Sequence, residues 1–202
     1  RKAIKYLKSR KITEKQIVAH KMGVCYSGEY QGRVIIPIWE NSELRFWIAR
    51  AITSDAYLKE KSPSDEDYQI SKSEVIFNID RAAKKYHSCV ISEGIFDCLS
   101  FGDIGVSLLG KVLYEAQLNI LLDYRELLSE GIYIALDWDA RDKATEMAER
   151  LSEFFDVKMI NIPEEYDDPN KYRQKHKQSA MWDLIQSAEP YGEFSKLRRM
   201  LT

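Results

Sequence analysis

The sequence is poor in cysteine and histidine, and it has no long hydrophobic run. Its three cysteines, Cys25, Cys89 and Cys98, form no Cys-x-x-Cys pair, and its three histidines are scattered. This spacing supports neither a disulfide framework nor a zinc site, so we expect no zinc in this segment. No stretch of about 18 apolar residues and no basic leader with an apolar segment is present. We therefore expect a cytoplasmic protein without a membrane span.

The overall composition is that of an ordinary folded protein, but the charges are unevenly distributed. The 202 residues are 45% hydrophobic and 31% charged, enough for one large or two small domains. Residues 1–86 contain 17 Lys and Arg against 11 Asp and Glu, whereas residues 87–202 contain 13 against 21. A basic surface attracts phosphate backbones, and an acidic cluster can hold metal ions, so this pairing favours a nucleic-acid partner. The alternative is that these charged surfaces simply face water and bind no partner.

Residues 1–86 are predicted to form a mixed α+β basic subdomain. The predicted elements are two short helices within residues 1–21, strands at 33–39 and 44–50, a surface loop at 53–73 and a helix at 75–83. Thr13 and Gln16 fit a capping box before the second helix. Pro37 cannot donate to a strand ladder, so it indicates an edge position or a bulge in a β-hairpin.

Residues 87–168 alternate between short apolar runs and helical patterns, which predicts an α/β domain with a central parallel four-stranded sheet flanked by helices. The predicted strands are 89–92, 105–109, 132–136 and 157–162, and the predicted helices between them are 95–101, 114–129 and 141–154. Residues 169–202 are predicted to form a short helical tail, with a helix at 179–188 and a basic end at 196–199.

Acidic residues follow three of the predicted strands. Glu93 and Asp97 follow the first strand, Asp137 and Asp139 the third, and Asp168 the fourth. Because ligand sites of such sheets lie beyond the carboxyl ends of the strands, these acids are expected to gather in one region. Their mutual repulsion would raise their pKa values, and a hard divalent cation such as Mg²⁺ would relieve it. For each acid taken singly, an N-cap to the following helix is the alternative.

The acids occur in an order that resembles the Toprim domain, a metal-binding fold of DnaG-type primases, topoisomerases and some nucleases. The motifs are Glu93-Gly94 with Asp97, Asp137-Trp138-Asp139, and Asp168-Pro169. The preceding module is similar to the basic subdomain of bacterial and phage DnaG-type primases through Arg33-Val-Ile-Ile-Pro-Ile38, Trp47-Ile-Ala-Arg50, Tyr57-Leu58 and Ser71-Lys72. Leu109-Gly110 and Gln117 also match, and the resemblance covers about residues 1–188.

The resemblance implies the catalytic core of a DNA primase, which makes short RNA primers from ribonucleoside triphosphates on single-stranded DNA with Mg²⁺ or Mn²⁺. It implies that Glu93, Asp137 and Asp139 are catalytic and that these three, with Asp97 and Asp168, hold the metal. Whether Glu93 is a general base or a ligand stays open. Arg33, Arg50 and Lys72 are implied to hold template or nucleotide phosphates. A replicative helicase is the expected further partner, contacted through a region outside this chain.

Four positions depart from the family pattern. Ala56 replaces a lysine before Tyr57, Trp138 and Asp142 replace two glycines, and Asn170 replaces an acid, although Asp167 lies nearby. These changes concern nucleotide binding more than the acidic cluster.

Two other functions use the same motifs. A Toprim-type nuclease would hydrolyse phosphodiesters with the same carboxylates, but the basic Arg33 to Lys72 pattern argues against it. A non-catalytic module that binds DNA or a helicase would have no use for a cluster of mutually repelling acids.

Overall fold

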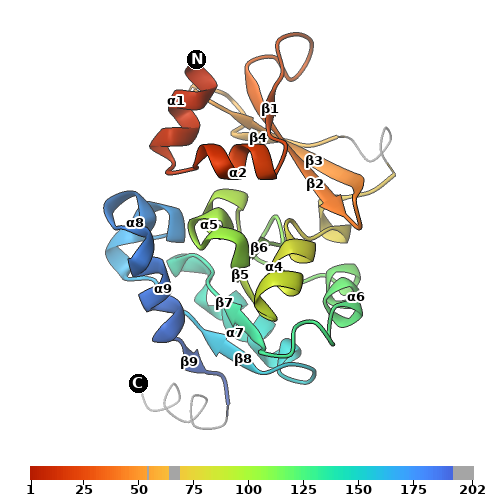
Figure 1. Ribbon diagram of the computed structural model, residues 1–202, viewed down its shortest axis with the longest axis vertical. Helices are drawn as coiled ribbons and strands as arrows, with labels where there is room; N and C mark the ends of the chain where they lie inside the picture. Colours follow the sequence, from red (N-terminus) through yellow and green to blue (C-terminus); the bar gives the residue numbers. More distant parts are fainter. Residues whose placement is uncertain (54, 64–68, 193–202) are drawn as a thin grey trace.

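The protein, described here by a computed structural model, consists of two β-sheets with helices packed around them (Figure 1). The structure describes residues 1–53, 55–63 and 69–192. The N-terminal elements are α1 (Lys2–Ser9), α2 (Glu14–Ala19), β1 (Gly23–Val24), β2 (Arg33–Glu40), β3 (Glu43–Ala51), β4 (Glu60–Lys61), the short 3-10 helix η1 (Lys72–Glu74) and α4 (Ile79–Tyr86).

The remaining elements build the second sheet and its helices. They are β5 (Cys89–Ser92), α5 (Ile95–Ser100), η2 (Gly102–Ile104), β6 (Gly105–Ser107), α6 (Glu115–Asp123), β7 (Ile132–Ile134), η3 (Trp138–Ala140), α7 (Arg141–Leu151), β8 (Val157–Met159), η4 (Glu164–Tyr166), α8 (Pro169–Lys175), α9 (Gln178–Gln186) and β9 (Glu189–Pro190).

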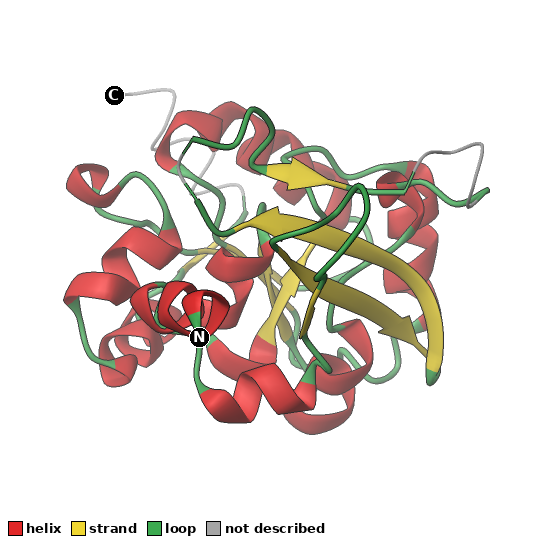
Figure 2. Cartoon of the chain, turned by 90° about the horizontal axis from the view of Figure 1, so that it is seen from above, coloured by secondary structure: helices red, strands yellow, loops and turns green. Residues whose placement is uncertain are grey.

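The first sheet is antiparallel, with the strand order β1-β2-β3-β4, and its long β2–β3 hairpin is prominent in Figure 2. Pro37 lies opposite Trp47, and the register shifts immediately afterwards, between Ile38 and Trp39. On its other side β2 pairs with β1 only at Val34 and Ile35. Pro37 therefore lies where β2 is an edge and beside a bulge, the two settings in which its missing N–H is tolerated.

The second sheet has the order β6-β5-β7-β8-β9, and its first four strands are parallel. The predicted α/β class and the parallel four-stranded sheet are confirmed. From β5 the chain proceeds to β6 on one side, and β7 then returns to the other side of β5. This reversal opens a crevice at the carboxyl ends of β5 and β7, which is where such sheets bind ligands.

Three predictions about elements are corrected by the structure. The sheet gains an antiparallel edge strand, β9, whose two residues are too few to give a periodic signal. Residues 75–77 are extended rather than helical, and Phe77 pairs with Ser107; these residues are apolar, and α4 begins only after the left-handed Asn78. Helix α8 was not predicted. The predicted loop at 53–73 contains the short strand β4 and the start of η1. Residues 54 and 64–68 of that loop and the basic end at 196–199 lie outside the described residues.

The two sheets are joined by a shared hydrophobic core. Leu7 of α1 and Ile36 and Phe46 of the hairpin belong to the same buried cluster as Phe96 and Leu99 of α5. Because buried side chains of both parts pack together, the basic hairpin and the second sheet are held in one arrangement. The division at residues 86 and 168 stays a prediction.

No helix within the described residues has both the length and the apolar character needed to cross a membrane.

The approach of α5 to β6 generates a stability prediction. A Cβ atom at position 105 would come within 1.9 Å of the Cys98 carbonyl oxygen, which belongs to the backbone and cannot swing aside. Gly105→Ala should therefore lower the free energy of unfolding by about 1 to 3 kcal/mol in urea titrations. Gly110→Ala is the matched control, because nothing lies within 4 Å of its added Cβ. Equal stability of the two variants would contradict the close contact between β6 and α5 at Gly105.

Candidate active site

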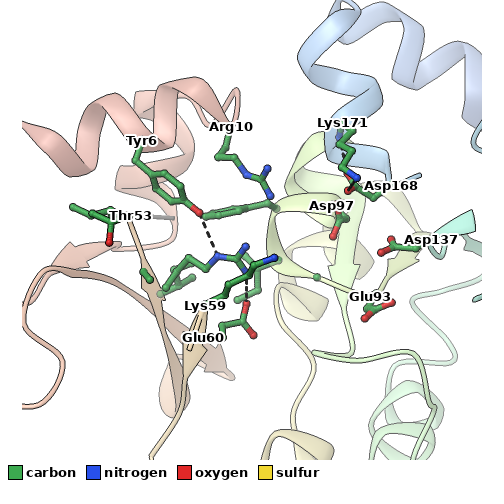
Figure 3. A pocket seen from close by; sticks show the side chains of 17 residues that line it. Tyr6, Arg10, Thr53, Lys59, Glu60, Glu93, Asp97, Asp137, Asp168 and Lys171 are labelled. Atoms are coloured by element: carbon green, nitrogen blue, oxygen red, sulfur yellow. Dashed lines mark hydrogen bonds and ion pairs between the residues drawn. The ribbon is translucent and has the colours of Figure 1, made fainter. Parts of the chain in front are cut away.

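A cleft of about 790 Å³ lies between the N-terminal module and the carboxyl end of the second sheet. Figure 3 shows acidic side chains on one wall and mainly basic and aromatic side chains on the other. The acids at the end of the second sheet that line it are Glu93, Asp97, Asp137 and Asp168; Glu60 lines the opposite wall, and the cations are Arg10, Arg50, Lys59 and Lys171. The structure thus brings four of the five predicted acids to one cleft.

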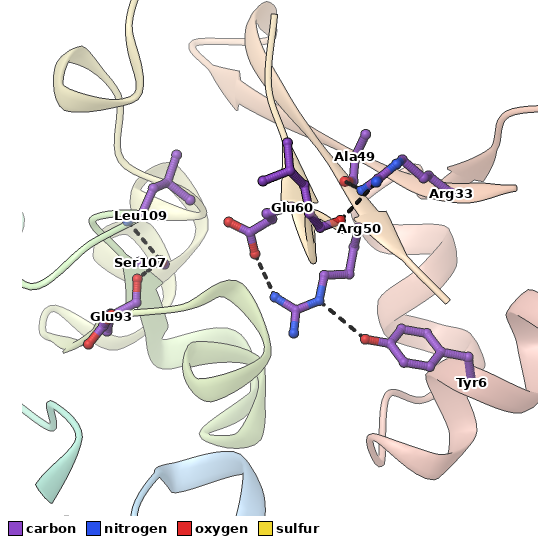
Figure 4. A network of polar contacts seen from close by, with 9 residues as sticks. Tyr6, Arg33, Ala49, Arg50, Glu60, Glu93, Ser107 and Leu109 are labelled. Atoms are coloured by element: carbon purple, nitrogen blue, oxygen red, sulfur yellow. Dashed lines mark hydrogen bonds and ion pairs between the residues drawn. The ribbon is translucent and has the colours of Figure 1, made fainter. Parts of the chain in front are cut away.

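Glu93 is positioned by the loops that follow β5 and β6. The Ser107 hydroxyl donates to the Glu93 carbonyl at 2.8 Å, and the backbone N–H of Gly110 donates to the same oxygen at 3.1 Å. The Leu109 N–H in turn donates to the Ser107 hydroxyl at 3.0 Å (Figure 4). Because β5 adjoins β7 in the sheet, Asp137, which follows β7, reaches the same edge.

Asp97 lies in the first turn of α5, where Gly94 makes room for it. A Cβ atom at position 94 would come within 2.6 Å of the Asp97 Oδ2. The Asp97 Oδ1 accepts a hydrogen bond from the backbone N–H of Asn170 at 3.2 Å. The start of α8 is therefore tied to α5 through one of the acids.

The N-cap alternative is correct for only one acid of the cleft. The Asp168 Oδ1 accepts from the Lys171 backbone N–H at 2.6 Å and caps α8. Glu93 and Asp97 are not N-cap residues, and Asp137 precedes η3 without a side-chain cap. Helix capping therefore does not account for the acids that follow β5 and β7.

Burial and mutual repulsion disfavour ionisation of these carboxylates. Burial, with added repulsion from Asp168 and Asp137, raises the pKa of Asp97 to about 8. Burial, with added repulsion from Glu93 and Asp168, raises the pKa of Asp137 to about 7. Burial also raises the pKa of Glu93, which Lys111 opposes. Such perturbed acids in a cleft are typical of functional sites.

Two carboxylate oxygens have no partner among the described residues. Both Glu93 Oε2 and Asp137 Oδ1 are buried and accept no hydrogen bond there. Oxygen ligands of this kind suit Mg²⁺ or Mn²⁺, so the chemistry of the cleft fits a hard cation. Within the described residues, however, no group of three or more His, Cys, Asp or Glu side chains is arranged to hold a metal ion. The five metal ligands stay a prediction.

Asp139 is placed differently from the other acids. Its side chain is 74% exposed, its Oδ2 lies 3.2 Å from the Lys111 Nζ, and it is outside the residues that line the cleft. It is near enough to add to the repulsion that raises the pKa values of Glu93 and Asp137. Lys111 was not predicted, because a single lysine in a loop carries no sequence signal.

The three predicted basic residues have separate positions. The Arg50 Nε donates to the Tyr6 hydroxyl at 3.2 Å, and its NH1 pairs with the Glu60 Oε2 at 2.7 Å (Figure 4). Arg50 thus lines the cleft in a fixed orientation. Arg33 is buried and donates to the carbonyls of Ala49, at 3.1 Å, and Leu58, at 2.8 Å. Its binding to phosphate stays a prediction.

Lys72 is exposed at the start of η1, and its charge acts to lower the pKa of Glu93. Its carbonyl accepts from the buried Gln117 side chain at 3.3 Å, and the same amide donates to the carbonyls of Val75 and Leu108. Gln117 therefore fixes the backbone that carries Lys72 beside the second sheet.

Asn170 explains one departure from the family pattern. It is fully buried, and its amide nitrogen donates to the Arg10 carbonyl at 2.9 Å and the Ser100 hydroxyl at 3.0 Å. An ionised acid at this position could not donate these bonds. Asp167 is exposed and pairs with Lys171 at 2.6 Å.

Comparisons with known proteins found one family model and several primases that are similar to this chain. A family of Toprim-like domains matches residues 90–173. The DNA primase of Thermotoga maritima is 27% identical over 188 residues, which cover 88% of this chain and 32% of that protein. The chain spans about one third of the length of the curated primases it matches.

Two solved structures share the fold. The Aquifex aeolicus primase, with zinc-binding and RNA polymerase domains, has a TM-score of 0.80 at 23% identity over 95% of this chain and 57% of that one. A DnaG primase catalytic domain bound to single-stranded DNA has a TM-score of 0.77 at 15% identity over 94% and 72%. The chain therefore has the fold of a DnaG-type primase catalytic core, and the predicted resemblance is confirmed.

The raised pKa of Asp97 predicts how stability depends on pH. The folded protein keeps a proton that the unfolded chain releases above its ordinary pKa of 3.8, so stability should fall as the pH rises from there to about 8. In EDTA, urea titrations should show a loss of roughly 1 to 3 kcal/mol across this window. Asp97→Asn should flatten the decline, because asparagine does not titrate.

Glu126→Gln, an exposed acid outside the cleft, is the control and should keep the decline. Millimolar MgCl₂ should restore more stability at the alkaline end than at the acidic end, because protons compete with the cation. An unchanged pH dependence of stability in Asp97→Asn would contradict the assignment of the raised pKa to Asp97.

Proposed function

We propose that this chain is the catalytic core of a DNA primase, which joins ribonucleoside triphosphates into short RNA primers on a single-stranded DNA template by metal-assisted nucleotidyl transfer. The observation that carries the proposal is the cleft itself, where two buried carboxylate oxygens without hydrogen-bond partners among the described residues face a mainly basic wall across a space of about 790 Å³. The relatives named DNA primase and the shared fold support it.

Glu93, Asp97, Asp137 and Asp168 would hold Mg²⁺ or Mn²⁺, with Asp139 beside them. The bound cation would supply charge neutralisation at the transferred phosphoryl group and a lower pKa for the attacking 3′-hydroxyl. The raised pKa of Glu93 makes its carboxylate a stronger proton acceptor. Its unpaired Oε2 could take the proton of a hydroxyl bound in the cleft.

The opposite wall would bind and orient the phosphates. Arg50 is held by Tyr6 and Glu60, so its guanidinium is fixed rather than free to follow a passing anion. Lys59 and Arg10 line the same wall and add positive charge. Positive charge opposite the acids would hold and align a triphosphate or a template backbone within the cleft.

The proposal extends to the organisation and partners of the chain. Residues 1–86 would bind phosphates, residues 87–168 would hold the metal, and residues 169–202 would form the tail, of which 193–202 lie outside the described residues. The single-stranded template, ribonucleoside triphosphates and RNA primer would bind here. A replicative helicase would bind outside this chain, in the cytoplasm of a bacterial cell or phage-infected host.

A Toprim nuclease would use the same carboxylates to cut a strand. The held Arg50 and the cations beside it favour nucleotidyl transfer from a triphosphate to a 3′-hydroxyl, with pyrophosphate leaving, because a triphosphate brings more charge to be neutralised than a diester does. A non-catalytic module is disfavoured because burial of unpaired carboxylates costs stability without serving a binding function.

The first functional prediction concerns Asp137. The chain, mixed with labelled ribonucleotides and MgCl₂ or MnCl₂, should extend an RNA primer annealed to template DNA, which bypasses any need for a recognition sequence. Asp137→Asn should lower extension by about 100-fold or more, because it removes a buried charge from the metal site. Glu126→Gln should keep wild-type extension, and shortened DNA in place of longer RNA would identify a nuclease.

The second functional prediction concerns Arg50. Arg50→Ala should weaken binding of single-stranded DNA and lower the slope of log affinity against log salt by about one, because one phosphate contact is lost. Arg45→Ala is the control, since Arg45 lies on the same strand, pairs with Glu40 at 3.5 Å and does not line the cleft. Fluorescence anisotropy measures the affinity of each variant and its salt dependence. Equal salt slopes for the two variants would contradict the role of Arg50.

A further inference from the structure

A second cavity, of about 600 Å³, lies between α2, β2 and the start of α4, elements that Figure 1 labels. We call it the α2–β2–α4 pocket; its main lining residues are His20, Lys21, Trp39, Phe77, Arg81 and Lys84. It shares no lining residue with the acidic cleft. Its volume is in the range of pockets that hold small molecules.

The inner wall of the pocket contains polar atoms that need a partner. His20 is only 6% exposed, and its Nε2 makes no hydrogen bond within the described residues. The Nε1 of Trp39 is also buried and makes none there. The His20 ring packs against Phe77 at 4.8 Å between centroids, so the His20 nitrogen lies beside an aromatic ring. A ligand with hydrogen-bonding atoms at the edge of a flat ring would satisfy both polar atoms.

The rim of the pocket is basic. Arg81, Lys84 and Lys85 lie three and four residues apart on α4, so they share one face of the helix. On the opposite side, the Lys21 Nζ lies 4.0 Å from the centre of a Trp39 ring. This arrangement of cations around aromatic rings favours an anion that also carries an aromatic group.

The acids near the rim already have partners. Asp80, in the lining, accepts from the Asn41 N–H at 2.8 Å and from the Tyr124 hydroxyl. Asp103, outside the lining, pairs with Lys85 at 2.7 Å. Lys84 is exposed and has no ion pair within the described residues. A positive charge therefore remains available at the mouth of the pocket.

The pocket is preformed rather than dependent on a mobile segment. The buried Asn78 side chain donates to the carbonyls of Asp103, at 3.0 Å, and Gly105, at 2.7 Å, and so fixes the start of α4. The Arg81 NH2 donates to the Ala19 carbonyl at 3.3 Å and joins α4 to the end of α2. A ligand would meet a rigid site, which favours specific binding.

We propose that the α2–β2–α4 pocket is a second ligand site that binds a nucleotide, with the base beside His20 and Trp39 and the phosphates at Lys84 and Lys21. The nucleotide is either a free mononucleotide or one unit of a nucleic-acid strand, since both present the same base and phosphate. An acidic peptide fits less well, because its carboxylates would reach the rim but its backbone would not stack beside the aromatic rings. The site needs neither the carboxylate cluster nor a divalent cation.

The test uses ATP, oligoadenylate RNA and tripolyphosphate as probes and polyglutamate as a competitor, in EDTA and low salt so that binding at the acidic cleft is not supported by a cation. Isothermal titration calorimetry measures affinity. ATP or oligoadenylate should bind more tightly than tripolyphosphate. Lys84→Glu, which reverses a rim charge, and Trp39→Phe, which removes the recessed N–H, should each weaken binding by about tenfold. Lys5→Glu, an exposed lysine on α1 outside the pocket, should stay within about twofold of wild type.

Each outcome decides the proposal. Tight ATP binding that both variants weaken supports a free nucleotide, and binding of oligoadenylate alone with the same dependence supports a strand. Binding of tripolyphosphate as tight as that of ATP and oligoadenylate would overturn the role of the base. Affinities in Lys84→Glu and Trp39→Phe equal to that in Lys5→Glu, no binding of any probe, or displacement of bound ATP by polyglutamate at equal affinity would overturn the site.

Discussion

The repulsion among carboxylates buried at the ends of β5 and β7 is the constraint on which the rest of the cleft depends. Burial and neighbouring acids raise the pKa values of Asp97 and Asp137 to about 8 and about 7, so ionised side chains would separate if the backbone allowed it. The backbone does not allow it, because Ser107 and Gly110 hold Glu93, and Asn170 holds Asp97. The surrounding hydrogen bonds thus maintain an arrangement that the charges alone would disperse.

The second wall of the cleft depends on the shared core rather than on charge. Leu7 and Phe46 pack with Leu99, which fixes the N-terminal module against α5. Tyr6 and Arg50 consequently reach the cleft from different elements and are joined by a hydrogen bond of 3.2 Å. A hinge between the modules would separate the phosphate-binding wall from the acids. Their common core makes that motion costly, since it would expose buried apolar side chains.

Four of the five predicted acids line the cleft, but only one of the three predicted basic residues does, for a physical reason. Glu93 and Asp137 follow short apolar runs, and the topology of parallel sheets gathers everything that follows such runs at one edge. No comparable rule says which surface cation faces a cleft. Arg33 and Arg50 lie on the two strands of one hairpin, yet Arg33 bonds to carbonyls whereas Arg50 lines the cleft. That choice is made by tertiary packing, as is the pairing of β9.

Three of the four departures from the family pattern lie within a few residues of the predicted acids, and the five predicted acids themselves are present. Asn170 lies beside Asp97 and Asp168, where an ionised acid would have added another negative charge to a region that is already strained. Trp138 is accommodated because its backbone N–H donates to the Asp167 carbonyl at 2.7 Å, and its ring is covered by Arg141, whose guanidinium carbon lies 3.2 Å from the ring centre. The loop after β7 therefore gains a packed ring where the pattern has glycine. Asp137 keeps its position at the end of β7 because Trp138 is held by the hydrogen bond to Asp167 and by the contact with Arg141.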